Sequence, residues 1–160
     1  MGYKVLAINP GSTSTKVALY DEERPLLDLT LRHSTEEISR FANVIDQLDW
    51  RKEMVLEALA KNNFDVKSLS AVIGRGGLIK PIESGVYEVN AALKNDLVNA
   101  QREHASNLGG LIAEQIAQIL GRLGGRFHFG FLDDGRRGGL ASFGALLGRL
   151  AQDFEFGAQS

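Results

Sequence analysis

The sequence predicts an α/β fold, because strand patterns alternate with helix patterns along residues 1–120. Residues 4–8 and residues 71–73 are short apolar runs, which are typical of buried strands. Residues 108–119 instead carry Leu and Ile at helical spacing, which predicts a helix. With 160 residues, the chain is long enough for one domain with a hydrophobic core.

A β-hairpin is expected at the N-terminus. Turn-forming residues occupy positions 9–15, between the strand at 4–8 and a second strand pattern at 16–20. Residues 26–31 alternate with period two and predict a third strand, and residues 86–89 predict a further one.

Three more helices are expected. Ser34 and Glu37 fit a capping box at the start of one helix over residues 34–48. A second helix is expected over residues 51–61, and Asn90 can cap a third. The apolar residues expected to face inward from these helices are Ile38, Phe41, Ile45, Leu48, Val55, Leu56, Leu59, Leu93, Leu97 and Val98.

Composition excludes several classes of function. The chain has no cysteine, which excludes disulfides and thiolate metal sites, and its net charge of −2 gives no basic surface for nucleic acid. Its histidines, His33, His104 and His128, lack the spacing of metal ligands. There is no signal-peptide pattern, and no apolar run approaches the ~20 residues of a membrane span. We therefore expect a cytoplasmic protein that binds neither nucleic acid nor membrane.

The last forty residues differ from the rest. Residues 1–120 hold eighteen Ile plus Val, whereas residues 121–160 hold none, together with ten of the eighteen glycines and six of the eight phenylalanines. A Gly-rich flexible tail is one interpretation, and translation from a shifted reading frame is the other. We favour the second, since folding normally retains β-branched core residues in α/β proteins. The expected division is a domain at 1–121 and a poorly ordered, unpacked tail at 122–160.

The turn at residues 9–16 has the chemistry of a phosphate-binding loop. Gly11 allows a close backbone approach, Ser and Thr hydroxyls supply donors, and Lys16 supplies positive charge. It is not a P-loop, because GxxxxGK[ST] is absent and a strand follows. The alternative is a Ser/Thr-rich turn without function.

Two further segments carry candidate chemistry. Arg75 lies in a glycine-rich stretch that follows a buried strand, where its guanidinium could bind a carboxylate or phosphate. His104 precedes a helix, whose N-terminus favours anions. The alternatives are a surface Arg in a glycine turn and a solvated histidine in a helix cap.

These segments resemble the acetate and butyrate kinase family, in order and in spacing. The resemblance covers residues 3–121 and is carried by KVLAINPGSTSTKVALY at 4–20, LRHS at 31–34, AVIGRGGLIKPIE at 71–83 and REHASNLGG at 102–110. It implies the first lobe of an actin-like (ribonuclease H-like) ATPase domain, here incomplete. It also implies transfer of the γ-phosphoryl group of ATP, with Mg²⁺, to butyrate or a similar short-chain carboxylate.

The resemblance also implies roles for individual residues. His104 and Arg75 would be catalytic, with Asn107 beside His104, and Asp133 or Asp134 is a loose match to a metal-binding aspartate of the family. The residues implied near the phosphates are Asn9, Gly11, Ser12, Ser14 and Lys16.

Beyond Gly121 the resemblance fails, so the chain is expected to be a truncated form with little kinase activity of its own. The alternatives are a non-catalytic remnant that binds phosphate or carboxylate, and a kinase completed by a separately encoded second lobe. The family is usually homo-oligomeric.

Overall fold

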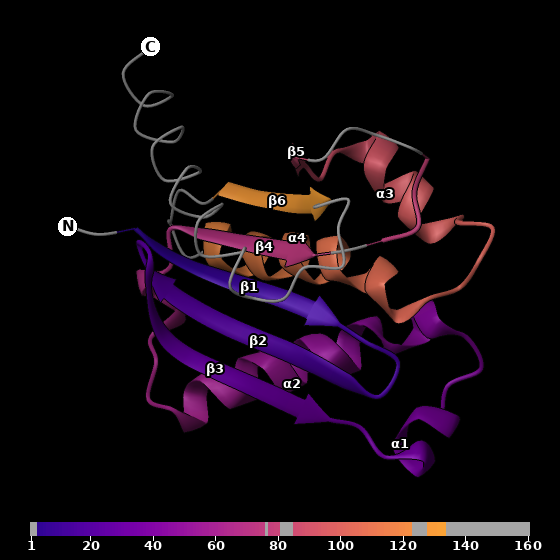
Figure 1. Ribbon diagram of the computed structural model, residues 1–160, viewed down its shortest axis with the longest axis horizontal. Helices are drawn as coiled ribbons and strands as arrows, with labels where there is room; N and C mark the ends of the chain where they lie inside the picture. Colours follow the sequence, from indigo (N-terminus) through magenta and orange to yellow (C-terminus); the bar gives the residue numbers. More distant parts are fainter. Residues whose placement is uncertain (1–2, 76, 81–84, 123–127, 134–160) are drawn as a thin grey trace.

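The computed structural model describes residues 3–75, 77–80, 85–122 and 128–133 (Figure 1). Within these ranges, the strands form one sheet with the order β3-β2-β1-β4-β6-β5. The strands are β1 (Lys4–Pro10), β2 (Ser14–Asp21), β3 (Arg24–Arg32), β4 (Ala71–Arg75), β5 (Gly85–Glu88) and β6 (His128–Asp133). The helices are α1 (Thr35–Ser39), α2 (Leu48–Lys61), α3 (Ala91–Val98) and α4 (Leu108–Arg122), with 3₁₀ turns η1 (Val44–Gln47), η2 (Val66–Ser68) and η3 (Ala105–Asn107).

The directions of the strands bring the carboxyl ends of several strands to one edge of the sheet. β1, β4 and β6 are parallel, β2 is antiparallel to both β1 and β3, and β5 is antiparallel to β6. The carboxyl ends of the three parallel strands therefore meet at one edge, which also holds the β1–β2 turn (Figure 1). The predicted α/β class is confirmed, and the strand order agrees with the actin-like, ribonuclease H-like fold that the resemblance implies.

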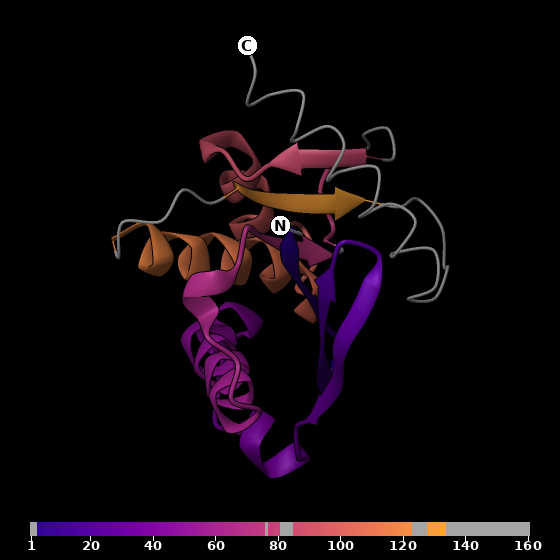
Figure 2. The ribbon, with the colours of Figure 1, turned by 90° about the vertical axis from the view of Figure 1, so that its left-hand side faces the viewer.

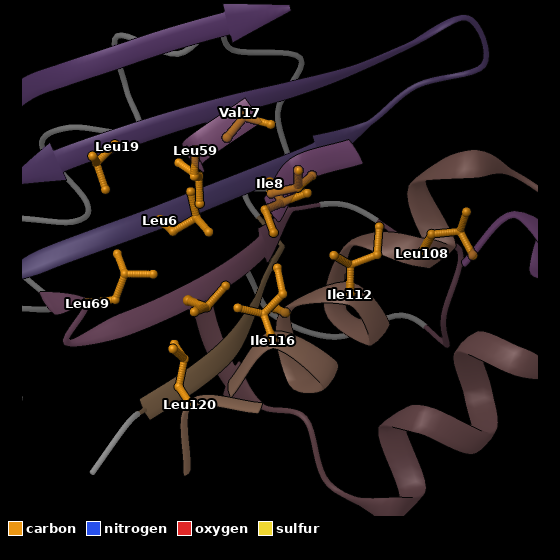
Figure 3. Packing of buried hydrophobic residues seen from close by; sticks show 13 residues of the cluster. Leu6, Ile8, Val17, Leu19, Leu59, Leu69, Leu108, Ile112, Ile116 and Leu120 are labelled. Atoms are coloured by element: carbon orange, nitrogen blue, oxygen red, sulfur yellow. The ribbon is translucent and has the colours of Figure 1, made fainter. Parts of the chain in front are cut away.

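Helices α2 and α4 lie on the same side of the sheet (Figure 2). The core between them and the strands includes Leu6 and Ile8 of β1, Leu59 of α2, and Ile112 and Ile116 of α4 (Figure 3). Removing this apolar surface from water is the main force that holds the layers together. No helix in the described part of the chain is long and apolar enough to cross a membrane.

The predicted helix over residues 34–48 is wrong, because two capping boxes divide this segment. Ser34 and Glu37 form the first, and it starts only the short α1. Asn43 then donates its backbone N–H to the Asp46 carboxylate at 3.0 Å, which begins η1 and leads into α2. The other predicted strands and helices are confirmed, with ends that differ by a few residues.

Strand β6 lies inside residues 122–160, the segment whose composition predicts an unpacked tail. It pairs in parallel with β4 and antiparallel with β5, so residues 128–133 join the sheet and correct that expectation. The domain division at Gly121, the shifted reading frame and the order of residues 134–160, which lie outside the described residues, stay predictions.

Candidate active site

The β1–β2 hairpin gathers the residues predicted to bind phosphate. Asn9 pairs with Lys16 across the ladder, and Ser14 lies two residues before Lys16 on the same face of β2. Gly11 donates its backbone N–H to the Ser14 carbonyl at 2.7 Å, which closes the tip. The tip residues Ser12 and Thr13 are exposed, and their backbone N–H groups have no acceptor among the described residues. The hairpin thus presents free donors next to an exposed lysine.

A cluster of buried polar side chains supports the hairpin tip from the interior of the protein. Arg51 of α2 is 1% exposed and donates to the Gly11 carbonyl at 2.7 Å and to Thr15 Oγ1 at 3.1 Å. Gln47 Oε1 accepts from Arg51 Nε at 3.0 Å and from Nη2 at 2.8 Å. Thr15 Oγ1 is also 2.8 Å from His33 Nε2, and both side chains are buried.

Sequence reasoning missed this cluster, although a signal was present. At a spacing of four residues, Gln47 at the end of η1 precedes Arg51, Val55 and Leu59 of α2, so two polar side chains continue the inward stripe of the helix. A buried arginine on an apolar stripe indicates acceptors on the neighbouring element, which here is the hairpin tip.

His33 makes this cluster sensitive to acid. Burial lowers the pKa of His33, the charge of Arg51 lowers it further, and Glu37 acts in the opposite direction. Because the folded pKa is lowered, the associated stability is present above the unfolded pKa of about 6.5. It is lost as the pH falls through the folded pKa.

We therefore expect the free energy of unfolding to fall more steeply between about pH 7 and about pH 5 in the wild type than in His33→Gln. Urea unfolding of both proteins at a series of pH values measures this difference. Parallel profiles would contradict it.

Close backbone contact joins the three predicted segments. A Cβ atom on Gly74 would overlap the carbonyl group of Gly109 and the amide nitrogen of Gly110. A Cβ atom on Gly109 would lie 2.8 Å from the Arg75 carbonyl oxygen and 3.3 Å from Pro10 Cδ. Glycine is therefore required where the end of β4 meets the start of α4, and this contact holds the Arg75 segment and the hairpin against α4.

Asn107 holds the segment before α4 to the loop after β4. Its Oδ1 accepts from the Leu78 backbone N–H at 2.7 Å, and its Nδ2 donates to the Arg102 carbonyl at 3.2 Å. The side chain is buried, so its role in the described structure is to fix these two segments. Gly77, which precedes Leu78, has a φ of 135°, a conformation that favours glycine.

His104 is exposed, and its ring orientation is fixed by Ser106. The Ser106 backbone N–H donates to His104 Nδ1 at 3.1 Å, and Ser106 Oγ lies 2.7 Å from the same nitrogen. Because Nδ1 accepts, a neutral His104 ring carries its proton on Nε2. Nε2–H has no protein partner among the described residues, so it can donate to a ligand.

For the other predicted site residues, Arg75, Asp133 and Asp134, the structure gives a position in the fold at most. Arg75 ends β4 and is half-buried. Asp133 ends β6 at the same sheet edge, whereas Asp134 lies outside the described residues. Within the described ranges, no group of three His, Asp or Glu side chains could hold a metal ion.

A cavity of about 570 Å³ lies near this site, lined by residues 78–80, Asn95, Asp96 and residues 99–102. None of the residues predicted to bind phosphate or to be catalytic lines it. We therefore do not assign the phosphoryl chemistry to this cavity.

Known proteins with similar sequences carry one recurring name. A probable butyrate kinase of Clostridium botulinum (strain Eklund 17B / Type B) is 52% identical over 121 residues, which are 75% of this chain and 34% of that protein. Butyrate kinase 1 of Clostridium acetobutylicum is 54% identical over 117 residues, 72% of this chain and 33% of that protein. A probable butyrate kinase of Bacteroides thetaiotaomicron is 54% identical over 117 residues, with 73% and 33% covered.

No family model matches the chain. A solved structure of a propionate kinase from Francisella tularensis subsp. tularensis SCHU S4 is similar with a TM-score of 0.44 and 14% identity, covering 81% of this chain and 36% of that one. The chain spans 34% of the length of the first curated relative that it matches. Over its N-terminal three quarters, the chain is therefore similar, at 52–54% identity, to about a third of the length of proteins named as butyrate kinases.

Proposed function

We propose that the chain provides the phosphoryl-binding part of a kinase that transfers the γ-phosphoryl group of ATP to butyrate or a similar short-chain carboxylate. The observation that carries this proposal is the meeting of the hairpin tip, the end of β4 and the start of α4 at one sheet edge. Proteins named as butyrate kinases are 52% identical to the chain over 121 residues and 54% identical over 117 residues. An ATP-dependent enzyme of this kind would work in the cytoplasm.

The proposed reaction needs charge neutralisation more than a strong base. A carboxylate is already ionised at pH 7, so its oxygen can form a bond to the γ-phosphorus while the bond to the ADP oxygen breaks. The products are an acyl phosphate and ADP. The difficulty is to bring one anion to another, and catalysis then consists of positioning and electrostatic stabilisation.

The described residues have the groups that this chemistry needs. The free N–H groups of Ser12 and Thr13, with Lys16 beside the tip, would bind phosphate oxygens. His104 would donate from Nε2–H to an oxygen of the transferring phosphoryl group, and Arg75 would bind the carboxylate. Magnesium would neutralise phosphate charge, and Asp133 or Asp134 is the proposed ligand.

A chimera tests the proposal. Residues 1–121 of this chain are joined to the unmatched part of butyrate kinase 1 from Clostridium acetobutylicum, to which they are 54% identical over 117 residues. With ATP, Mg²⁺ and butyrate, we expect butyryl phosphate, trapped as the hydroxamate by hydroxylamine. The matched control is the intact Clostridium enzyme under the same conditions.

A folded chimera that forms no hydroxamate would support the alternative of a non-catalytic remnant that binds phosphate or carboxylate. The same assay on the 160-residue chain alone measures how much activity it has without the added part.

A further inference from the structure

A buried cation, Arg51, contacts the hairpin tip and has no carboxylate partner among the described residues. Arg51 is 1% exposed, and its hydrogen bonds go to neutral acceptors: Gln47 Oε1, Thr15 Oγ1 and the carbonyls of Gly11 and Ser14. No carboxylate among the described residues pairs with it. Burial of an unpaired charge is costly, so buried charges normally have a partner of opposite sign.

Arg51 keeps its positive charge in spite of burial. Desolvation lowers the pKa of Arg51 to about 10, which still leaves the guanidinium protonated at neutral pH. The Arg51 guanidinium therefore stays charged at neutral pH, and it contacts the β1–β2 turn that is proposed to bind phosphate.

The hydrogen bonds of Arg51 also set the direction of the backbone at the tip. Its Nη1 binds the Gly11 carbonyl at 2.7 Å and lies 3.4 Å from the Ser14 carbonyl, while the His33 backbone N–H binds the Thr13 carbonyl at 2.9 Å. With these carbonyls held by the protein, the N–H groups of Ser12 and Thr13 stay without an acceptor in the described structure. Such a set of free N–H groups is an anion-binding arrangement.

We propose that Arg51 is a positioning residue for the β1–β2 hairpin. The bound phosphoryl group supplies the negative charge that Arg51 lacks in the protein. Arg51 holds the tip in its anion-binding conformation and raises anion affinity through its charge. The inference rests on the proposed function, because it requires that the hairpin bind phosphate.

Inorganic phosphate titrated into the ¹⁵N-labelled full chain tests this inference, with the N–H resonances of Ser12 and Thr13 as reporters. In Arg51→Met we expect phosphate affinity to fall by about tenfold or more, and its dependence on salt to weaken. Arg51→Lys keeps the charge but loses the planar set of guanidinium N–H donors, so it should retain part of the phosphate affinity. The matched control is Lys52→Gln, which removes the same charge from the next residue of α2 and should change affinity by less than about twofold.

A measurement on the wild type covers the case in which Arg51→Met does not fold. The Arg51 Nε–H group, which binds Gln47 Oε1 at 3.0 Å, should shift with the same phosphate dependence as the Ser12 N–H group. The inference is overturned if the tip responds to phosphate but Arg51 does not, or if folded Arg51→Met binds phosphate as tightly as wild type. In either case the proposal that the β1–β2 hairpin binds phosphate is unaffected. If the wild-type tip does not respond to phosphate at all, the proposed function fails together with the inference.

Discussion

Gly74→Ala is expected to destabilise the domain by about 3 kcal/mol or more, at or beyond the upper end of ordinary overpacking. The added methyl group would occupy the space of the Gly109 carbonyl and the Gly110 amide nitrogen. These are backbone atoms at the start of α4, so the helix would have to move away from β4. For a chain of this length, such a loss lowers Tm by about 6 °C or more.

Gly121→Ala is the matched control, since a Cβ atom on Gly121 would meet nothing within 4 Å. It is expected to stabilise the domain by about 0.5–1 kcal/mol, because alanine is the better helix former. Urea and thermal unfolding of the two variants beside the wild type measure both effects. Equal stabilities for Gly74→Ala and wild type would show that β4 and α4 are not in the close contact described here.

The hairpin tip and the start of α3 could be predicted because their signals are local. Gly11 and the hydroxyl residues around it specify a turn between two strand patterns, whatever the rest of the chain does. Asn90 likewise caps α3 as predicted, and its Oδ1 accepts from the Leu93 N–H at 2.9 Å.

Other features depend on contacts between distant residues. Arg51 contacts Gly11 across forty positions, and no local pattern says which acceptor a buried arginine will find. Gly74 and Gly109 look like ordinary turn or helix-start glycines until the sheet brings β4 against α4. The helix predicted at 34–48 failed because helical spacing continued across a second capping box, at Asn43 and Asp46.

Strand β6 shows how composition can mislead. The loss of Ile and Val argues against a packed strand, yet Phe127, Phe129 and Phe131 alternate with period two, which is a strand signal. The backbone of residues 128–133 follows that periodicity and pairs with two other strands. A local periodic pattern was the better guide here than the average over forty residues.

His104→Ala in the chimera is expected to lower kcat by about 10²–10³-fold and to change KM much less. The reason is that a hydrogen bond from Nε2–H to a phosphoryl oxygen strengthens as charge moves onto that oxygen in the transition state. Such a contact contributes little to binding of the ground state. Steady-state kinetics with ATP and butyrate, read out as hydroxamate, separate the two parameters.

Ser106→Ala is the companion variant, because it tests whether the fixed ring matters. It removes the hydroxyl that lies 2.7 Å from Nδ1 but leaves the backbone N–H that donates to the same nitrogen at 3.1 Å. The ring then keeps its tautomer with one of its two contacts, so kcat should fall by about tenfold or less. An unchanged kcat in His104→Ala would instead make His104 a cap of η3, since its side chain already accepts from the Ser106 N–H in that role.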